Sequence, residues 1–388
     1  MSSLIFGSIP YYKINKILWT WTLYDGEDGC HIVRDTVLSL NKAPPALRDQ
    51  PKPPPKPPAR WPTPEERRAN TFAVISSFKK WLDSSDPPKQ KKPAAEKKVE
   101  VAPPFDIQEI PDAMRATHMP VGAKLMEKWF AGELNYSPDD AAEAAMTNQD
   151  GKPYPPGMID SKTIKMDWIL EFSRAKERYE FLINTAIYNE LARNEVLRKL
   201  APYARRGIVD LNAWKECPDL PSLHKRFQFQ LGSVDGTLEQ KFAMFIAEQS
   251  RGTPDDLTAA LGSFNFYAAI ASARIEPGVM TVTHIVVYVK DSYTFGTKPD
   301  EASQYLGHWN RKGVIVVPTF VAAQVSNIDW LEFPVAIYTS GPKYMVYYPV
   351  KNSTFREWQM RHRQGGDFII YSDCVPIRLK TPIRVYYK

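Results

Sequence analysis

Cysteine is scarce in this chain: Cys30, Cys217 and Cys374 are its three cysteines, and they lie far apart without a CxxC pair. This spacing predicts neither a disulfide framework nor a zinc site. Long apolar runs are missing as well, because none approaches the roughly 20 residues that a membrane-spanning helix needs. The N-terminal residues lack the basic start, apolar block and small-residue cleavage site of a secretory signal peptide. We therefore predict a cytoplasmic protein without a transmembrane segment.

The usual signatures of catalysis are also absent. The sequence contains no GxGxxG, GxxxxGK[ST], HExxH or GxSxG motif. Each of these motifs builds a particular phosphate loop, zinc centre or nucleophile turn, so the corresponding nucleotide-binding, zinc-protease and hydrolase classes are not indicated. No cofactor class is indicated either, and we predict no metal site.

Basic charge is present, but it is concentrated in two short stretches. The formal net charge is +6, from 50 basic and 44 acidic residues. Residues 51–60 contribute +3 and residues 87–98 contribute +4, so the rest of the chain sums to −1. Both stretches are rich in proline and lysine, which is typical of a solubilising spacer. The distribution therefore gives no strong nucleic-acid signal.

Composition and periodicity divide the chain into four segments. Residues 14–24 and 30–40 have an alternating apolar pattern on either side of Asp25–Gly26, which predicts a hairpin. Residues 44–104 hold 15 of the 34 prolines, and proline fixes φ and lacks an N–H, so an extended linker is predicted there. The predicted segments are an N-terminal β-hairpin at 1–43, a proline-rich basic linker with one short helix at 44–104, a helical region at 105–262 and a β-rich C-terminal domain at 263–388.

The middle of the chain has helical periodicity. Apolar residues recur every three or four positions over 164–186, which predicts a long helix capped at Asp160 or Ser161. We expect a break near 189–194 and an end at Pro202 and Gly207. The stripe that we predict to be buried consists of Trp168, Phe172, Tyr179 and Leu182.

After Gly262 the apolar period changes to two, which is typical of strands. One predicted helix, at 353–363, interrupts these strands. The strands are predicted at 264–275, 279–291, 313–318, 333–339, 343–350, 367–373 and 383–387. So many short strands favour a curled sheet or a partly open barrel. The predicted fold class is α+β, with a helical middle region followed by a strand-rich C-terminal domain.

Several long aromatic-rich stretches carry a family resemblance. They are MPVGAKLMEKWF at 119–130, IKMDWILEFSR at 164–174, VKDSYTF at 289–295, YLGHWNRKGV at 305–314 and FREWQMRHRQGGDFIIYSDC at 355–374. Together they resemble an uncharacterised bacterial domain-of-unknown-function family, over roughly residues 105–388, whose members are often encoded near type VI secretion genes. The resemblance implies a Gram-negative cytoplasmic protein that is exported by a signal-peptide-independent type VI route. It implies a spike or tip protein, an immunity protein or a cognate effector as partner, and it carries over no catalytic residue.

The densest group of polar residues lies in the C-terminal domain, and from it we predict four catalytic residues: His308, His362, Asp367 and Asp291. An imidazole titrates near neutral pH and a carboxylate can fix its tautomer, so a His–Asp pair could act as a general base. We expect the four side chains to converge on one concave surface. The alternative interpretation is structural. In it, Asp291 and His308 lie in turns, and His362 lies in the last turn of a helix, where a cation suits the helix dipole.

Three classes of function remain open from the sequence. The first is a type VI secretion-associated antibacterial effector with its toxic part in the C-terminal domain. The second is a non-enzymatic adaptor or chaperone that loads an effector onto the secretion tip. The third is a membrane-active toxin. Whether the protein is an enzyme therefore stays open at this level.

Overall fold

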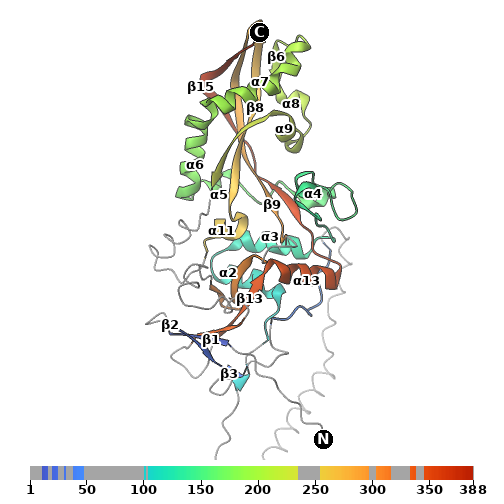
Figure 1. Cartoon of the computed structure of the whole chain (residues 1–388), viewed down its shortest axis with the longest axis vertical. Coiled ribbons are helices and arrows are strands. Elements are labelled where there is room, and N and C mark those ends of the chain that lie inside the picture. Colours follow the sequence, from blue (N-terminus) through green and yellow to red (C-terminus); the bar gives the residue numbers. More distant parts are fainter. Residues whose placement is uncertain are drawn as a thin grey trace, which may run out of the picture. The chain divides into compact units, whose positions relative to one another are not determined.

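Figure 1 shows the computed structural model of the chain. It describes residues 11–15, 20–24, 30–31, 38–47, 100–101, 104–234, 254–296, 303–315, 333–337 and 345–387. The chain divides into two compact units, one made of Met1–Arg48 and Val101–Lys388 and the other of Asp49–Glu100. Nearly all of the second unit, which contains most of the predicted linker, lies outside the described residues. The first unit contains every feature discussed below.

Helices occupy much of the region around residues 107–230, and a strand-rich part follows, as the sequence predicts. Asn189, Asp219 and Asp255 cap three of them, because each side chain accepts a hydrogen bond from a backbone N–H in the first turn. None of the helices in the described part of the chain is both long and apolar enough to cross a membrane. The helices are η2 (Ile107–Glu109), α2 (Ile110–Ala116), α3 (Pro120–Phe130), α4 (Asp140–Ala144), η3 (Pro156–Met158), α5 (Met166–Ile169), α6 (Ser173–Asn184), η4 (Ala186–Tyr188), α7 (Glu190–Arg205), α8 (Ala213–Glu216), α9 (Leu220–Phe227), α11 (Asp256–Leu261) and α13 (Asn352–His362).

The predicted long helix is divided into α5, α6, η4 and α7. It does not begin at Asp160, because the Asp160 carboxylate accepts hydrogen bonds from the N–H groups of Lys162 and Thr163 and holds a tight turn there. The predicted break is found slightly early, with Asn189 as the N-cap of α7. The prediction that Pro202 ends the helix was wrong. Pro202 lies inside α7, between positions whose side chains are buried in the core.

The predicted buried stripe is only partly buried. Leu182 on α6 is fully buried, whereas Trp168, Phe172 and Tyr179 are half-buried and pack against the core. Phe172 lies edge-on to Trp168 with 5.5 Å between ring centroids, and the Arg174 guanidinium lies over its ring. The reason is that α6 begins after Phe172, so a single helical face does not run through all four positions.

Seven strands form a sheet that curls into a half-barrel, which confirms the predicted architecture. The strands are β5 (Ile159–Asp160), β6 (Asp210–Asn212), β7 (Gln228–Val234), β8 (Phe264–Glu276), β9 (Val279–Tyr293), β14 (Phe368–Tyr371) and β15 (Val375–Tyr386). The long antiparallel hairpin β8–β9 is the spine of this sheet (Figure 1). We call the half of the hairpin that contains the turn between β8 and β9 its outer half, and the other its inner half. Strands β7 and β14 flank the inner half, and β6 and β15 flank the outer half. Helices α6 and α7 pack against β7 and β8, and α7 also contacts β15.

The second sheet has six strands in the order β11-β10-β13-β12-β1-β2. They are β1 (Tyr11–Asn15), β2 (Thr20–Tyr24), β10 (Tyr305–Asn310), β11 (Gly313–Ile315), β12 (Val335–Ile337) and β13 (Met345–Lys351); two short strands, β3 (Cys30–His31) and β4 (Glu100–Val101), lie outside it. β1 pairs in parallel with β12, so the N-terminal strands extend a sheet of C-terminal strands. The N-terminal hairpin joins β1 to β2 rather than crossing Asp25–Gly26, because Tyr11 pairs with Tyr24.

Strand β10 was missed by the sequence analysis, which placed His308 in a turn. Gly307 has a left-handed φ of 110°, and the pairing of β10 with β13 shifts register between Tyr305 and His308. The glycine therefore marks an irregularity within a strand rather than a chain reversal. Asp291 does not lie in a turn either, as the structural alternative had it, because β9 continues through this residue to Tyr293.

Aromatic rings join α3 to α13 in the core. Trp129 on α3 meets Phe295 edge-on at 5.0 Å, and Phe295 stacks on Phe355 of α13 at 3.8 Å between ring centroids. Phe130 and Trp358 complete the cluster at 4.8 Å. This packing fixes the chain after α3 beside the chain after α13, where one of the predicted site residues lies.

Candidate functional site

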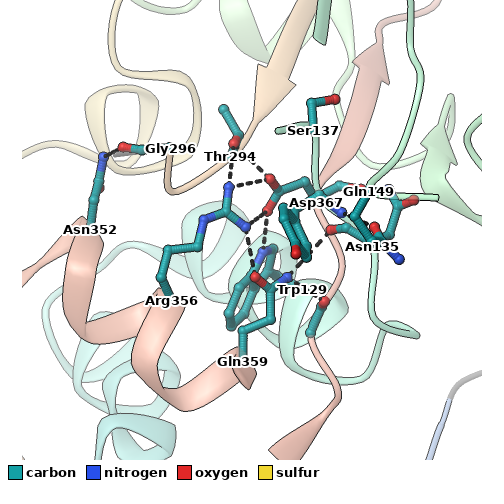
Figure 2. Close-up of polar contacts among 12 residues, drawn as sticks. Trp129, Asn135, Ser137, Gln149, Thr294, Gly296, Asn352, Arg356, Gln359 and Asp367 are labelled. Atoms are coloured by element: carbon teal, nitrogen blue, oxygen red, sulfur yellow. Dashed lines mark hydrogen bonds and ion pairs between the residues drawn. The ribbon is translucent and has the colours of Figure 1, made fainter. Parts of the chain in front are cut away.

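Asp367 lies in a dense buried network of polar side chains (Figure 2). Its carboxylate is 1% exposed and accepts hydrogen bonds from Trp129 Nε1 at 2.9 Å and Thr294 Oγ1 at 2.7 Å. The Arg356 guanidinium binds both carboxylate oxygens, at 2.5 and 3.1 Å. Arg356 also donates to Gln359 at 2.8 Å. We call these five residues the Asp367 network.

Backbone bonds hold the Asp367 network in place. The N–H of Gly366 donates to the carbonyl of Trp129, and the N–H of Asp367 donates to the carbonyl of Asn135 at 2.7 Å. Asn135 Nδ2 returns a hydrogen bond to the Asp367 carbonyl at 2.6 Å. A Cβ on Gly366 would lie 2.6 Å from the carbonyl oxygen of Glu133, so the close approach of the two segments requires glycine. The network therefore joins segments more than 200 residues apart into one rigid unit.

His308 lies on β10 and is fully buried. Its Nε2 donates to the carbonyl of Phe333 at 2.9 Å, since a carbonyl only accepts. Its Nδ1 lies 2.5 Å from the Tyr305 hydroxyl, which also bonds to the carbonyl of Ile315 at 3.3 Å. Nε2 therefore connects β10 to the chain just before β12, whereas the Nδ1 contact lies within β10.

His362 and Asp291 lie in other surroundings. His362 Nε2 donates to the carbonyl of Leu40 at 2.7 Å, and its ring lies 4.8 Å from that of Trp358. Asp291 lies on β9 opposite Ile370, and burial raises the pKa of its carboxyl well above the usual range.

The structure does not join the four predicted residues by hydrogen bonds. Asp291 lies on β9, and Asp367 directly precedes β14, which pairs with β9. His308 and His362 instead bond to the carbonyls of Phe333 and Leu40. Within the described residues, no group of three or more His, Cys, Asp or Glu side chains could hold a metal ion. The catalytic role of His308, His362, Asp367 and Asp291 stays a prediction.

A second polar cluster, which the sequence analysis did not identify, lies on one face of the curled sheet. We call it the His224 centre, and it consists of His224, Tyr267, Tyr288, Lys290 and Tyr371. His224 on α9 has its Nδ1 2.9 Å from the Tyr288 hydroxyl and its ring edge-on to Tyr267 at 4.8 Å. Strand register places Tyr267 opposite Tyr288 and Tyr371 opposite Lys290.

The surroundings of the His224 centre favour uncharged forms of its members. The pKa of His224 is lowered to about 4, mainly by burial and in smaller part by the ammonium groups of Lys290 and Lys199. Burial also lowers the pKa of Lys290 and raises the pKa of each of the three tyrosines. At neutral pH, His224 is therefore uncharged and Lys290 releases its proton more readily than an exposed lysine does.

Hydrogen-bond accounting assigns the tautomer of His224. The Tyr288 side chain is fully buried, and among the described residues its hydroxyl bonds to His224 Nδ1. A buried hydroxyl must donate, so Tyr288 donates to Nδ1, and the proton of the neutral imidazole resides on Nε2. The half-buried part of the centre therefore presents three donors, His224 Nε2–H, the Lys290 amine and the Tyr267 hydroxyl.

Sequence reasoning missed this cluster for a physical reason. His224 precedes Lys225 and Arg226 in the last turn of α9, where basic residues commonly complement the helix dipole. The three tyrosines lie on separate strands, and only the strand register brings them together. A single hint was available, since a tyrosine hydroxyl within an otherwise apolar strand needs a buried partner.

Comparison with known proteins gives a family but no activity. The model of a family of unknown function, DUF6402, matches residues 105–387. No curated protein and no solved structure matches the chain. The matched region contains both the Asp367 network and the His224 centre. It also spans most of the chain, so this protein belongs to the DUF6402 family of unknown function.

Proposed function

We propose that this protein is a type VI secretion-associated antibacterial effector whose toxic activity resides at the His224 centre. In this proposal it is made in the cytoplasm and exported without a signal peptide, with a spike or tip protein and an immunity protein as partners. The observation that supports an active centre is the clustering of an uncharged histidine, a lysine with a lowered pKa and three tyrosine hydroxyls. Groups with shifted pKa values gather preferentially at functional sites.

The arrangement suits a reaction in which negative charge develops on oxygen. His224 Nε2–H and the Tyr267 hydroxyl are uncharged groups, and each can donate a hydrogen bond to such an oxygen. Lys290 releases its proton more readily than an exposed lysine does, because burial lowers the pKa of its ammonium group. Tyr288 acts through His224, since its hydroxyl holds the imidazole in the required tautomer. Four of the five residues lie in the predicted C-terminal domain.

Toxicity in a naive bacterium tests this proposal. The full chain is expressed in the cytoplasm and, with an added export signal, in the periplasm. The parent should stop growth in one compartment, and His224→Gln or Lys290→Met should reduce killing about 100-fold or more, the size of a lost acid–base or oxyanion contribution. His118→Asn is the matched control, because His118 is exposed and asparagine tolerates its left-handed φ of 63°.

The same assay tests the residues predicted from sequence. If His362 and Asp291 are structural, His362→Ala and Asp291→Asn should keep toxicity wherever circular dichroism shows a folded chain. Full toxicity of His224→Gln would contradict the proposed centre. Leakage of dye from lipid vesicles exposed to the purified chain would instead favour the membrane-active class.

A second candidate function, the non-enzymatic adaptor, is favoured by one specific observation. The outer half of the β8–β9 hairpin exposes polar and basic side chains on one face, which is a surface that a partner can occupy. An adaptor should be non-toxic in both compartments. It should also form a complex of fixed stoichiometry with a purified effector or spike protein, measured by sedimentation.

A further inference from the structure

One face of the sheet in the outer half of the β8–β9 hairpin is exposed. Residues of β15 alternate between buried and exposed positions, and Leu379, Ile383 and Val385 form its buried side. The labels β6, β8 and β15 mark this end of the sheet in Figure 1. We call the exposed side the outer face; its basic and aromatic residues are Arg274, His284, Arg378, Lys380, Arg384 and Tyr386, and its acidic residues are Asp210 and Glu276.

Strand register brings these residues together. Arg378 on β15 lies opposite His284 on β9. Arg384 lies opposite Thr281, which in turn pairs with Arg274 on β8. The basic side chains therefore come from two strands and lie in successive rows of one face.

The acidic residues of the outer face lie next to Arg274, since Asp210 on β6 is directly opposite it and Glu276 is two residues along β8, so the cations of β15 are the uncompensated ones. Arg378, Lys380 and Arg384 form no ion pair within the described residues, whereas Arg274 binds Glu276 at 3.0 Å. Strand β15 carries no acidic residue. The charge count along the sequence obscured this, because acidic residues elsewhere in the chain balance the cations of β15.

The chemistry of β15 disfavours a partner that adds to the sheet as a further strand. Pro376 and Pro382 lie within this strand, and among the described strands it pairs only with β9. Proline has no N–H to donate, and within sheets it is confined largely to edge strands and irregularities. A partner therefore finds its contacts on the outer face, with the side chains, rather than along the edge.

We propose that the outer face binds the sugar–phosphate backbone of single-stranded nucleic acid, an activity beyond the proposed toxicity. Arg378 and Lys380 are two residues apart on one side of the strand, so they lie about 7 Å apart along it and can follow an extended polyanion. Tyr386 is 74% exposed, lies two residues beyond Arg384 on β15, and offers a ring on which a base can stack. Arginine guanidinium groups bind phosphate oxygens in a bidentate manner.

Charged residues on an edge strand also have a simpler use, since they discourage association between sheets. That alternative predicts no affinity for nucleic acid. An acidic protein partner is a second alternative, and it predicts that poly-glutamate competes as well as an oligonucleotide does.

Fluorescence anisotropy with a labelled oligo-dT or oligo-U of about 20 nucleotides tests the proposal on the full chain. Each phosphate contact to a single strand contributes about 0.7 to the slope of log K against log salt. The Arg378→Gln/Arg384→Gln variant should therefore bind at least fivefold more weakly and show a slope reduced by about 1.4. Tyr386→Ala should weaken binding and leave the slope unchanged, because stacking releases no counterion.

The matched control removes two exposed cations from helices, Lys176→Gln on α6 and Arg193→Gln on α7. It should keep the affinity and slope of the parent, because it leaves the outer face intact. The basic stretches at 51–60 and 87–98 are the same in all variants, so they do not account for a difference between the two double variants. An equal loss in both double variants would assign binding to overall charge and overturn the proposal. The absence of binding at about 50 mM salt, or equal competition by poly-glutamate, would overturn it as well.

Discussion

The Asp367 network and the His224 centre are both polar clusters inside the same folded unit, yet their polar atoms are used in opposite ways. In the first, a charged carboxylate is surrounded by donors from Trp129, Thr294 and Arg356. In the second, His224 has one hydrogen-bond partner among the described residues, and burial keeps its ring neutral. The first cluster is complete without a ligand, whereas the second presents donors that a ligand could use.

This difference distinguishes polar groups that hold the fold together from polar groups that are available for binding or chemistry. A buried ion pair whose hydrogen bonds are satisfied fixes the relative position of the segments that supply it. The Asp367 network does so for the chain after α3 and the chain after α13. A centre with shifted pKa values and unused donors adds little to such rigidity, and its polar groups are better explained by binding or chemistry.

The largest expected effect is on the Asp367 network. Asp367→Asn keeps the shape of the side chain but leaves the Arg356 guanidinium, whose side chain is 14% exposed, without its counter-ion. We expect the free energy of unfolding to fall by about 3–5 kcal/mol, the cost of removing one partner of a buried pair. Urea unfolding followed by circular dichroism measures it.

An exposed ion pair on the same helix is the control. Arg361 and Glu357 are 44% and 61% exposed, so Glu357→Gln should cost less than about 0.5 kcal/mol. Equal losses in the two variants would show that burial does not distinguish the pairs, and the structural interpretation of Asp367 would fail.

A smaller loss is expected from the backbone contact beside this network. Gly366→Ala places a methyl group against the Glu133 carbonyl and the Met158 thioether, so the two segments must separate. We expect a loss of about 1–3 kcal/mol in unfolding free energy, typical of an overpacked site. Gly296→Ala is the matched control, since its added Cβ would meet only an ordinary contact at 3.8 Å. If both variants unfold at the same urea concentration, the close approach at Gly366 is not a real constraint.

The smallest effect concerns the His224 centre and depends on pH. The folded-state pKa of His224 is about 4, below its ordinary value of 6.5, so the unfolded chain binds more protons between these pH values. The free energy of unfolding should therefore decrease as pH falls from about 6.5 to about 4. With screening at this half-buried site, His224 should contribute about 1–2 kcal/mol to that decrease.

Comparison with His224→Gln isolates this contribution, because the carboxylates titrate in both proteins. The variant should lose less stability than the parent over the same pH range. A parallel pair of pH profiles would mean that His224 titrates normally, and the His224 centre would lose its main electrostatic feature.

Much of the fold follows from local pattern. The period of two after Gly262 located β8, β9, β12, β13 and β14 within a few residues, and the sequence pattern also located α13. Errors occurred where local signals conflicted with tertiary contacts. Gly307 resembles a turn residue but lies within β10, and Pro202 resembles a helix end but lies inside α7.

The candidate site was less accessible to such reasoning. Asp367 was singled out from the sequence as a catalytic candidate, but its partner Trp129 lies 238 positions away, and nothing in the sequence pairs them. The His224 centre was missed because it depends on the register of β8, β9 and β14 and on the placement of α9. Register is a contact between distant segments, so a single strand's pattern does not contain it.

The sequence by itself determined the α+β class, a helical middle region followed by a strand-rich part, and the position of the proline-rich stretch, because periodicity and proline chemistry act over a few neighbouring residues. Only the tertiary structure decided which polar residues meet. It gave Asp367 a buried arginine, gave His224 a tyrosine, and placed the cations of β15 beside Arg274 on one exposed face. The physical reason is that hydrogen bonds and charges act over a few ångströms in space, and the folding of the sheet sets those distances.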